Sequence, residues 1–274
     1  MISVTLMNNT DSQGLEQQLL QKYDGDVVKI LEVLERLKSQ SNRKERKPAT
    51  GKVVVSLTDT EKSYKVGRKS IAALHGVSLD VREGEYVALT GPSGSGKSTL
   101  LQLIGALDKP TTGVVKVNDQ DIAKLSDKQL SVFRNKTIGF VFQFFYLQPF
   151  LDLKTNLEVP AMFARTPRSK RREHAELLAD RVDITDRLRH LPNELSGGQM
   201  QRAAIARALM NNPKILLADE PTGNLDRKNA FAIMELFDAI REQFGTTVIV
   251  VTHDAALAAR ADREIRLQDG RIIG

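Results

Sequence analysis

The stretch GPSGSGKST at residues 91–99 decides the fold, because it fills every fixed position of the phosphate-binding pattern G-x-x-x-x-G-K-[ST]. The apolar run EYVAL at 85–89 predicts a strand before it, and the leucines and isoleucine of 99–107 follow at helical spacing. In a glycine-rich turn of this kind, backbone N–H groups face an anion at the positive end of the helix. The stretch therefore predicts a nucleoside-triphosphate site; the alternative is a glycine-rich turn without a ligand.

Side chains of the same stretch supply the charge and the hydroxyl that such a site needs. Lys97 is expected to neutralise oxygens of the β- and γ-phosphates, and Ser98 to offer its hydroxyl to Mg²⁺. The predicted nucleotide contacts are Gly91, Pro92, Ser93, Gly94, Ser95, Gly96, Lys97, Ser98 and Thr99.

Two carboxylates end the apolar run ILLADE at 215–220. A buried parallel strand delivers its last residues to the edge of the sheet where ligands of open α/β sheets bind. Asp219 is then expected in the Mg²⁺ shell, and Glu220 as the general base or the group that orients the attacking water. The alternative is a solvated acidic pair behind a core strand.

Polar residues also end two further strand-like runs. Gln143 follows IGFVF at 138–142, and His253 follows TVIVVT at 247–252. Because the carboxyl ends of parallel strands meet at one edge, we expect both side chains and the acidic pair to converge near the γ-phosphate. A lone histidine after a strand is more often structural, but its place in this ordered set favours a functional role.

The segment LSGGQ at 195–199 precedes an alanine-rich stretch that predicts a helix over 200–210, with Ser196 as its N-cap. Ser196, Gly197, Gly198 and Gln199 form a second anion-binding surface at a helix start. The nucleotide site at 91–99 already has its own loop, so this second surface has no nucleotide to bind within one chain. It suits a nucleotide held by another copy. The alternative is a simple helix cap.

In this order, GPSGSGKST, Gln143, LSGGQ, ILLADE, NLD at 224–226 and His253 resemble the nucleotide-binding domain of ABC transporters, over about residues 52–274. The resemblance implies an α/β, P-loop fold with a parallel sheet core, an antiparallel β subdomain and a helical subdomain at about 144–195. It also implies an ATP hydrolase that uses Mg²⁺ and binds ATP at a twofold dimer interface.

The resemblance implies a role for each matching residue. Tyr64 falls where the family stacks an aromatic ring on adenine, although an ordinary strand tyrosine is an equal alternative. Gln143 falls at the contact with Mg²⁺ and the membrane partner, and Asp226 at a loop that contacts the second subunit. Ser196, Gly198 and Gln199 match the signature that binds the opposite subunit's γ-phosphate, and His253 matches the switch histidine. The implied magnesium ligands are Ser98, Gln143 and Asp219, and the implied catalytic residues are Glu220, His253 and Gln143.

A finer resemblance concerns the segments at 104–113, 138–164 and 218–226, which are similar to the macrolide-export and lipoprotein-releasing ATPases. In that family the ATPase drives a permease with an extracytoplasmic domain and moves a macrolide, lipoprotein or peptide by export or mechanical extraction. The alternative is a cell-division ABC ATPase without transport, which typically ends its signature in glutamate where this chain has Gln199.

Two other classes predict features that the sequence lacks. ABC ATPases that act on DNA or ribosomes would show a long coiled-coil insertion or tandem ATPase domains, and a regulatory module without turnover would show a degraded base or signature. No nucleic-acid module accompanies the basic charge, so no nucleic-acid partner is expected.

Composition limits the class further. The chain has 274 residues, 41% of them hydrophobic, and no cysteine, which excludes disulfides and thiolate metal sites. No apolar run approaches the roughly 18 to 20 residues of a membrane span, and residues 1–14 do not resemble a signal peptide. We therefore expect a peripheral protein at the cytoplasmic side of the inner membrane, with the membrane part on another polypeptide.

Residues 1–51 depart from the family. Apolar residues at helical spacing predict an amphipathic helix: Val27, Ile30, Leu31, Leu34 and Leu37. The linker at 38–52 has six basic residues and one glutamate, a net charge of +5 against +6 for the whole chain. We expect this extension to contact the membrane partner or an anionic leaflet, with docking on the ATPase body and self-association as alternatives.

A second basic cluster lies at the start of the helix predicted over 169–182. It consists of Arg168, Lys170, Arg171 and Arg172. We expect a solvated helix face, with a phospholipid contact as the alternative.

Overall fold

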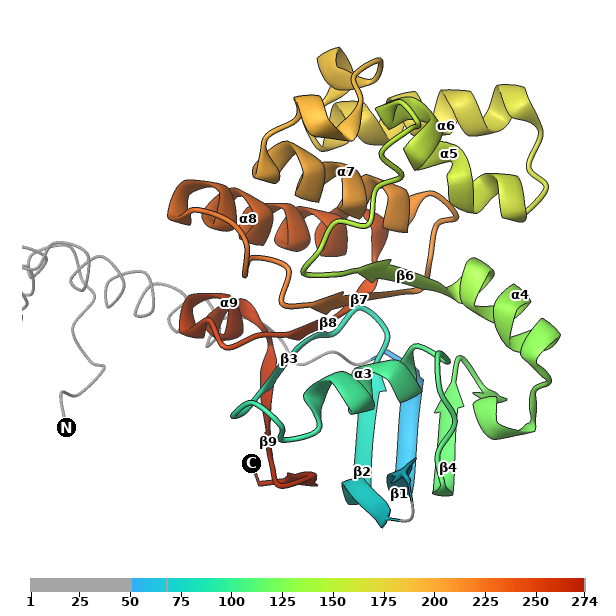
Figure 1. Cartoon of the computed structure of the whole chain (residues 1–274), viewed down its shortest axis with the longest axis vertical. Coiled ribbons are helices and arrows are strands. Elements are labelled where there is room, and N and C mark those ends of the chain that lie inside the picture. Colours follow the sequence, from blue (N-terminus) through green and yellow to red (C-terminus); the bar gives the residue numbers. More distant parts are fainter. Residues whose placement is uncertain (1–50, 68, 274) are drawn as a thin grey trace, which may run out of the picture. The chain divides into compact units, whose positions relative to one another are not determined.

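The computed structural model describes residues 51–67 and 69–273 (Figure 1). The helix predicted over 27–37 and the basic stretch up to residue 50 lie outside the described residues. The described residues form a six-stranded sheet with a parallel core and a four-stranded antiparallel sheet. The predicted α/β fold, with a parallel core and an antiparallel subdomain, is confirmed.

The six-stranded sheet is built around five parallel strands, with one short antiparallel strand at its edge. From one edge to the other the order is β10 (Arg271–Ile272), β9 (Arg263–Gln268), β3 (Tyr86–Thr90), β8 (Thr247–Val251), β7 (Ile215–Asp219) and β6 (Ile138–Val141).

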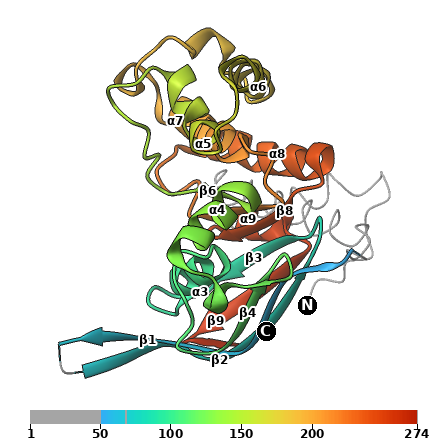
Figure 2. The ribbon, with the colours of Figure 1, turned by 90° about the vertical axis from the view of Figure 1, so that its right-hand side faces the viewer.

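The antiparallel sheet contains a long hairpin, which projects away from the parallel sheet in Figure 2. Its strands, in order, are β2 (Lys69–Arg82), β1 (Val53–Val66), β4 (Thr112–Val117) and β5 (Gln120–Asp121).

Seven α-helices connect these strands in the described part of the chain. They are α3 (Lys97–Ile104), α4 (Asp127–Thr137), α5 (Leu153–Phe163), α6 (Arg168–Arg181), α7 (Gly197–Leu209), α8 (Arg227–Phe244) and α9 (Ala255–Arg260). Single turns of 3-10 helix lie at Ile122–Lys124, Thr185–Arg187 and Pro192–Glu194.

The parallel sheet separates two apolar cores. Tyr86 and Ala88 of β3 join one core with residues of α5 to α9, whereas Val87 and Leu89 join a second core with residues of α3 and the antiparallel sheet. Figure 1 shows α7 and α8 on one side of the sheet and α3 on the other. Strands covered on both faces need continuous apolar sequence, which explains why the runs at 85–89, 215–218 and 247–251 do not alternate.

Capping explains where several helices begin. The predicted capping box at Ser126 is present: its side chain accepts from the backbone N of Gln129, whose side chain accepts from Ser126 in return. Ser196 and Gln199 form the same arrangement at the start of α7, so the predicted N-cap is confirmed.

The helix after the phosphate-binding stretch ends earlier than predicted. It stops at Ile104 rather than at residue 107, because Gly105 caps it and Ala106 turns to a left-handed φ of 52°. The strand expected over 138–142 likewise ends at Val141.

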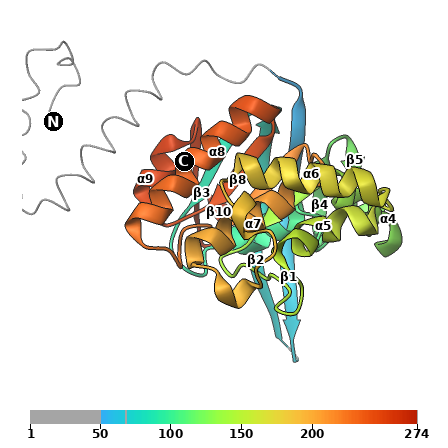
Figure 3. The same ribbon diagram turned by 90° about the horizontal axis from the view of Figure 1, so that it is seen from above.

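Helices α5 and α6 lie between β6 and α7 in the sequence and pack against each other and against α7, as Figure 3 shows from above. Leu157 of α5 and Leu178 of α6 are fully buried in the same core as Leu209 of α7. Helices α5 and α6 both lie within the segment predicted as a helical insertion.

Candidate functional site

The strand order gathers the predicted site residues at one edge of the parallel sheet. Ala88, Val250, Ala218 and Val141 lie opposite one another across β3, β8, β7 and β6. The residues that follow these strands therefore emerge side by side in that order: the loop at 91–98, His253, the pair at 219–220, and Gln143. The topology thus brings together the groups that were expected to converge.

The loop at 91–98 turns tightly around its own glycines. Gly91 has a φ of 142°, and a Cβ there would lie 2.1 Å from the backbone oxygen of Leu267, so only glycine is accommodated. Gly94 and Gly96 also have left-handed φ values, 79° and 100°. The loop leads directly into α3, as an anion-binding strand-to-helix turn requires.

Lys97 folds over this loop. Its Nζ donates hydrogen bonds to the backbone oxygens of Gly91 and Pro92, each at 2.9 Å. Ser95 is 2% exposed, and its hydroxyl has no hydrogen-bond partner among the described residues. An ammonium group held by carbonyl oxygens alone, a buried unpaired hydroxyl and a positive helix end together suit the phosphate groups of a nucleotide.

Asp219 and Ser98 meet beside the loop. Burial raises the pKa of Asp219 and Glu220 adds to this, while a hydrogen bond with the Ser98 side chain and the charge of Lys97 oppose the increase. The Ser98 hydroxyl and the Asp219 carboxylate are adjacent, and burial disfavours a carboxylate charge that no cation compensates. The two side chains therefore suit a bound cation.

No group of three or more histidine, cysteine or acidic side chains that could hold a metal occurs within residues 51–67 and 69–273. In nucleotide sites Mg²⁺ usually takes one or two protein carboxylates and completes its shell with phosphates and water. The oxygen donors of Ser98 and Asp219 therefore fit magnesium, with the amide oxygen of Gln143 available at the neighbouring strand end.

Glu220 contacts His253 directly. Nδ1 of the imidazole lies 2.8 Å from Oε2 of the carboxylate, which also accepts from the backbone N of His253 at 3.4 Å. Glu220 has a left-handed φ of 48°, and its own N–H donates to the backbone oxygen of Val251. The Glu220 side chain is 19% exposed and that of His253 is 74% exposed, so the imidazole is accessible to a ligand.

Gln143 lies beside the loop that follows Glu220. Its backbone oxygen accepts from Nδ2 of Asn224 at 2.9 Å, and a Cβ on Gly223 would lie 3.1 Å from its Nε2. The structure thus joins Gln143 to the NLD segment. This contact links the end of β6 to the end of β7.

The signature segment at 196–199 packs against the start of α8. A Cβ on Gly198 would lie 2.3 Å from Oδ1 of Asn229. Asn229 donates from its backbone N and its Nδ2 to the carboxylate of Asp226, at 2.8 and 2.7 Å, and these bonds lower the pKa of Asp226. Within the described residues, no hydrogen bond or ion pair joins 196–199 to the loop at 91–99.

Sequence reasoning missed Asn229, which is the link between the signature and Asp226. The available signal was its position three residues after Asp226, where an N-cap aspartate accepts from the backbone. It also missed Gln201, which is fully buried and donates to the backbone oxygen of Pro221 at 2.8 Å.

Tyr64 lies on β1, apart from the strand ends but next to the start of α3. Its hydroxyl donates to Oε1 of Gln102 at 3.4 Å, and Nζ of Lys62 lies 4.9 Å from its ring centroid. Burial raises its pKa, Asp108 adds to the increase, and Thr99 opposes it. The ring is therefore beside the last residue of the phosphate-binding stretch, and adenine stacking stays a prediction.

Comparisons with known proteins find relatives over most of the chain. The family described as ABC transporter matches residues 74–223. YknY of Bacillus subtilis, an ABC transporter ATP-binding protein, is 46% identical over 220 residues, which are 80% of this chain and 95% of YknY. The macrolide export ATP-binding/permease protein MacB of Brucella melitensis is 46% identical over 223 residues, which are 81% of this chain but 34% of MacB.

A solved structure gives the same result for the fold. The ATP-binding cassette MJ0796, determined as a dimer in a post-hydrolysis state with ADP and Pi, superposes with a TM-score of 0.75. The two sequences are 45% identical over 80% of this chain and 97% of that chain.

Proposed function

Because this chain belongs to the ABC transporter family and is an ATP hydrolase, we propose that its ATP cycle drives a separate membrane permease. We assign residues 52–274 to the ATPase domain, about 144–195 to its helical subdomain, and 1–51 to an N-terminal extension with a basic linker. The observation that supports the proposal is the strand order β3, β8, β7, β6. The loop at 91–98, His253, the pair at 219–220 and Gln143 lie at the carboxyl ends of these strands, along one sheet edge.

ATP binding is assigned to the loop at 91–99. Lys97 exchanges two neutral carbonyl partners for charged phosphate oxygens, which are stronger acceptors. The backbone N–H groups of the loop hold the phosphates at the start of α3. Tyr64, beside Thr99, is the proposed contact of the adenine ring.

Hydrolysis is assigned to Glu220 and His253. Glu220 accepts the proton of a water whose oxygen forms the new bond to the γ-phosphorus, and the bond from that phosphorus to the bridging oxygen breaks to give ADP and phosphate. The 2.8 Å contact with Nδ1 of His253 orients the carboxylate. His253 is the proposed contact of the γ-phosphate.

Ser98, Asp219 and Gln143 are the residues that would hold Mg²⁺. The ion would neutralise negative charge on the phosphate oxygens. The raised pKa of Asp219 supports this assignment, because its carboxylate gains most from a nearby cation.

The signature at 196–199 and Asp226 are proposed to act on a second copy of the chain. Their lack of a polar contact with their own loop at 91–99 supports this, as does the dimeric state of MJ0796. In a twofold, head-to-tail arrangement each phosphate loop faces the other copy's Ser196, Gly197, Gly198 and Gln199.

A surface for the membrane permease is proposed next to Gln143. A groove of about 320 Å³ between β6 and α5 is lined mainly by apolar side chains, including Phe140, Phe142 and Phe163. Phe144 is 61% and Phe163 is 81% exposed, which is unusual for phenylalanine and typical of a protein contact surface. None of the helices in the described part of the chain has the length and apolar sequence that a membrane span needs.

The proposed activity is export or mechanical extraction of a macrolide, lipoprotein or peptide through a permease with an extracytoplasmic domain, from the cytoplasmic side of the inner membrane. The 46% identity to a protein named for macrolide export supports this reading. A cell-division ABC ATPase without transport is the second candidate.

The experiment that tests this function is to purify the chain from membranes with its partner and measure ATP hydrolysis in vesicles, with and without candidate substrates. We expect the partner to be an integral membrane protein and the hydrolysis rate to respond to substrate. Lys97→Ala is the control, because it removes the positive charge that faces the phosphates and should greatly weaken ATP binding. A partner of the cell-division machinery and a rate that no substrate changes would favour the second candidate.

A further inference from the structure

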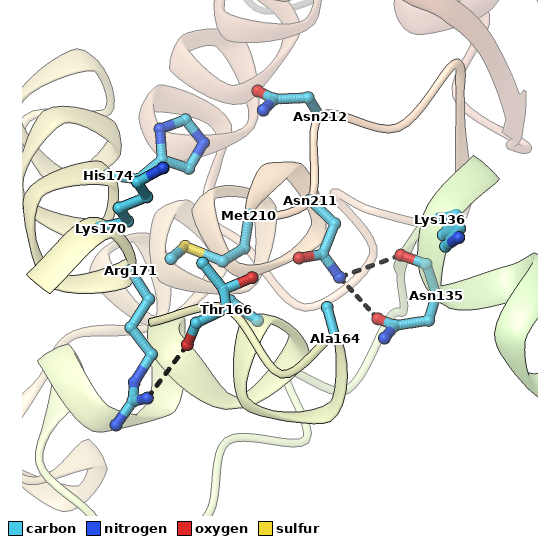
Figure 4. A pocket seen from close by; sticks show the side chains of 11 residues that line it. Asn135, Lys136, Ala164, Thr166, Lys170, Arg171, His174, Met210, Asn211 and Asn212 are labelled. Carbon is cyan, nitrogen blue, oxygen red and sulfur yellow. Dashed lines mark hydrogen bonds between the residues drawn. The ribbon is translucent and has the colours of Figure 1, made fainter. Parts of the chain in front are cut away.

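A second cavity lies on the helical side of the parallel sheet, away from the carboxyl ends of its strands. It is bordered by the end of α4, the turn between α5 and α6, the first turns of α6 and the end of α7 (Figure 4). Its volume is about 360 Å³, within the range of roughly 300 to 1,000 Å³ that small-molecule sites occupy. Its polar lining includes Lys136, Lys170, Arg171, His174, Asn211 and Asn212.

The cavity is positively charged. No acidic side chain lines it. Arg171 is paired with Glu158, whose Oε2 lies 2.6 Å from its Nε. In the part of the chain that the structure describes, Lys136 and Lys170 have no carboxylate within 4 Å. Two lysine charges therefore remain uncompensated at its rim.

His174 offers the cavity an unused hydrogen-bonding atom. Its Nε2 is buried and has no hydrogen-bond partner among the described residues. Burial and the charge of Arg181 hold the pKa of His174 below its ordinary value, with a contact from Asn212 opposing the shift. Figure 4 shows the ring next to Lys170, on the α6 side of the cavity. Buried polar atoms usually have a hydrogen-bond partner, and a ligand in the cavity would supply one here.

The start of α6 adds to the positive potential. Its N-cap is Pro167, which gives no side-chain hydrogen bond, and its first turn has no acidic residue. The positive end of the helix is thus left for another acceptor. Ala161, Ala164 and Met210 give the same cavity an apolar side.

We propose that this cavity binds a phosphate-bearing organic anion. Lys170 neutralises the phosphate and His174 donates a hydrogen bond to it, Lys136 adds positive charge from the opposite side of the cavity (Figure 4), and the organic part contacts Met210 and the two alanines. The cavity is larger than an inorganic phosphate ion. A ligand that fills it would therefore also carry an organic group, which would contact the apolar side. The sequence predicts that the basic cluster at 168–172 is a solvated helix face. In this proposal two of its residues, Lys170 and Arg171, line a ligand-binding cavity instead.

The site adjoins the groove proposed for the permease. Asn211 and Asn135 line both cavities. Nδ2 of Asn211 donates to the backbone oxygens of Asn135, at 2.9 Å, and Pro160, at 3.2 Å. A ligand in the basic cavity would therefore contact the wall of the apolar groove.

The test uses the full chain with its four histidines labelled for side-chain NMR, titrated with inorganic phosphate and with glycerol phosphate. His174 reports on the proposed cavity, and His253 reports on the phosphate loop. We expect glycerol phosphate to shift the His174 resonance saturably and more tightly than inorganic phosphate does. Lys170→Ala should weaken this binding about 10-fold, the effect of losing one hydrogen bond to a charged group.

Lys128→Ala is the matched control, because it removes the same charge from an exposed position on α4 outside the cavity. A second arm measures co-sedimentation with phosphatidic acid vesicles, against phosphatidylcholine vesicles. If only the vesicles bind, and Lys170→Ala weakens that binding while Lys128→Ala does not, the phosphate is a lipid headgroup. The proposal is wrong if glycerol phosphate moves only His253 and the two variants sediment alike.

Discussion

Nδ1 of His253 lies 2.8 Å from Oε2 of Glu220, so the side chains that follow β8 and β7 form one hydrogen-bonded unit. Glu220 has a φ of 48°, a left-handed conformation that costs an ordinary residue about 1 kcal/mol or more. A hydrogen bond from the backbone N of Glu220 to the backbone oxygen of Val251, at 2.9 Å, stabilises this conformation. The register of two neighbouring strands therefore fixes the position of the proposed general base.

Glu220→Gln should separate ATP binding from hydrolysis. Glutamine keeps the shape of the side chain but accepts no proton, so the hydrolysis rate should fall roughly 10²- to 10⁴-fold. ATP should remain bound, and the variant should accumulate as a dimer, as light scattering with and without ATP would show. Ser196→Arg in the same background should prevent the dimer. A Glu220→Gln chain that stays monomeric even with its membrane partner would contradict the two-copy arrangement.

Asp219→Asn should stabilise the nucleotide-free chain while it destroys activity. The pKa of Asp219 is raised from its ordinary value of 3.8, so the folded state disfavours its charge. The folded chain then binds the proton more tightly than the unfolded chain, and stability falls as pH rises from 3.8 through the raised pKa. Asparagine does not ionise, so the variant does not lose this stability. The melting temperature of Asp219→Asn near pH 7 should therefore exceed that of the wild type.

The stability difference between the Asp219→Asn variant and the wild type should shrink as pH falls toward 3.8, where the wild-type carboxyl is protonated. Activity should fall by more than the roughly 10- to 100-fold that loss of an outer metal partner costs. Thermal melts across pH, without nucleotide, measure the first effect. A variant that melts below the wild type at neutral pH would show that the Ser98 and Lys97 contacts outweigh burial.

Phe144→Ala should impair coupling to the permease more than ATP binding. Phe144 is 61% exposed, and truncating an aromatic contact residue costs about 1 kcal/mol or more, at least 5-fold in partner affinity. Leu147→Ala is the contrast, because Leu147 packs against the apolar core and its loss should lower the melting temperature instead. Equal loss of ATP affinity and transport in Phe144→Ala would mean that the residue serves only the fold.

Deleting residues 1–50 should leave ATP affinity unchanged but weaken retention on membranes. The deletion removes five basic residues and one glutamate of the linker, and each basic residue near an anionic leaflet contributes about 1 kcal/mol before screening. Binding of both chains to vesicles with and without anionic lipid, and to the permease complex, measures the difference. Loss of solubility or ATP affinity would instead place the extension in the ATPase core.

The sequence predicted the central strands well because the information is local. Continuous apolar runs of about five residues specify central strands, and each predicted site residue follows such a run directly. Parallel pairing then leaves one edge at which Gln143, Asp219 and His253 can meet. Ser126 and Ser196 were predictable as caps for the same reason, since the capping box spans four residues.

Contacts between distant segments were not predictable. Gly198 and Asn229 lie on different helices, and nothing in either segment specifies how the helices pack. The contact of Arg263 with Glu85, at 2.9 Å, joins residues 178 positions apart through the pairing of β9 with β3. The early end of α3 depends on the left-handed turn at Ala106, which helical spacing does not encode. The basic cavity was equally invisible, because four segments build it.

Gly198→Ala tests whether the signature glycine is required by packing on α8. A Cβ at this position would lie 2.3 Å from Oδ1 and 2.7 Å from Cγ of Asn229, and overpacking of this kind costs about 1 to 3 kcal/mol. We expect a lower melting temperature and, in the Glu220→Gln background, a weaker ATP-dependent dimer. Asn229→Ala should restore most of both losses in the double variant, because it removes the clashing atoms and leaves only the Cβ, 3.3 Å away. Asn193→Ala, at an exposed position before the signature, should restore neither. If Asn229→Ala restores the melting temperature but not the dimer, Gly198 is needed for contact with the second copy rather than for packing on α8.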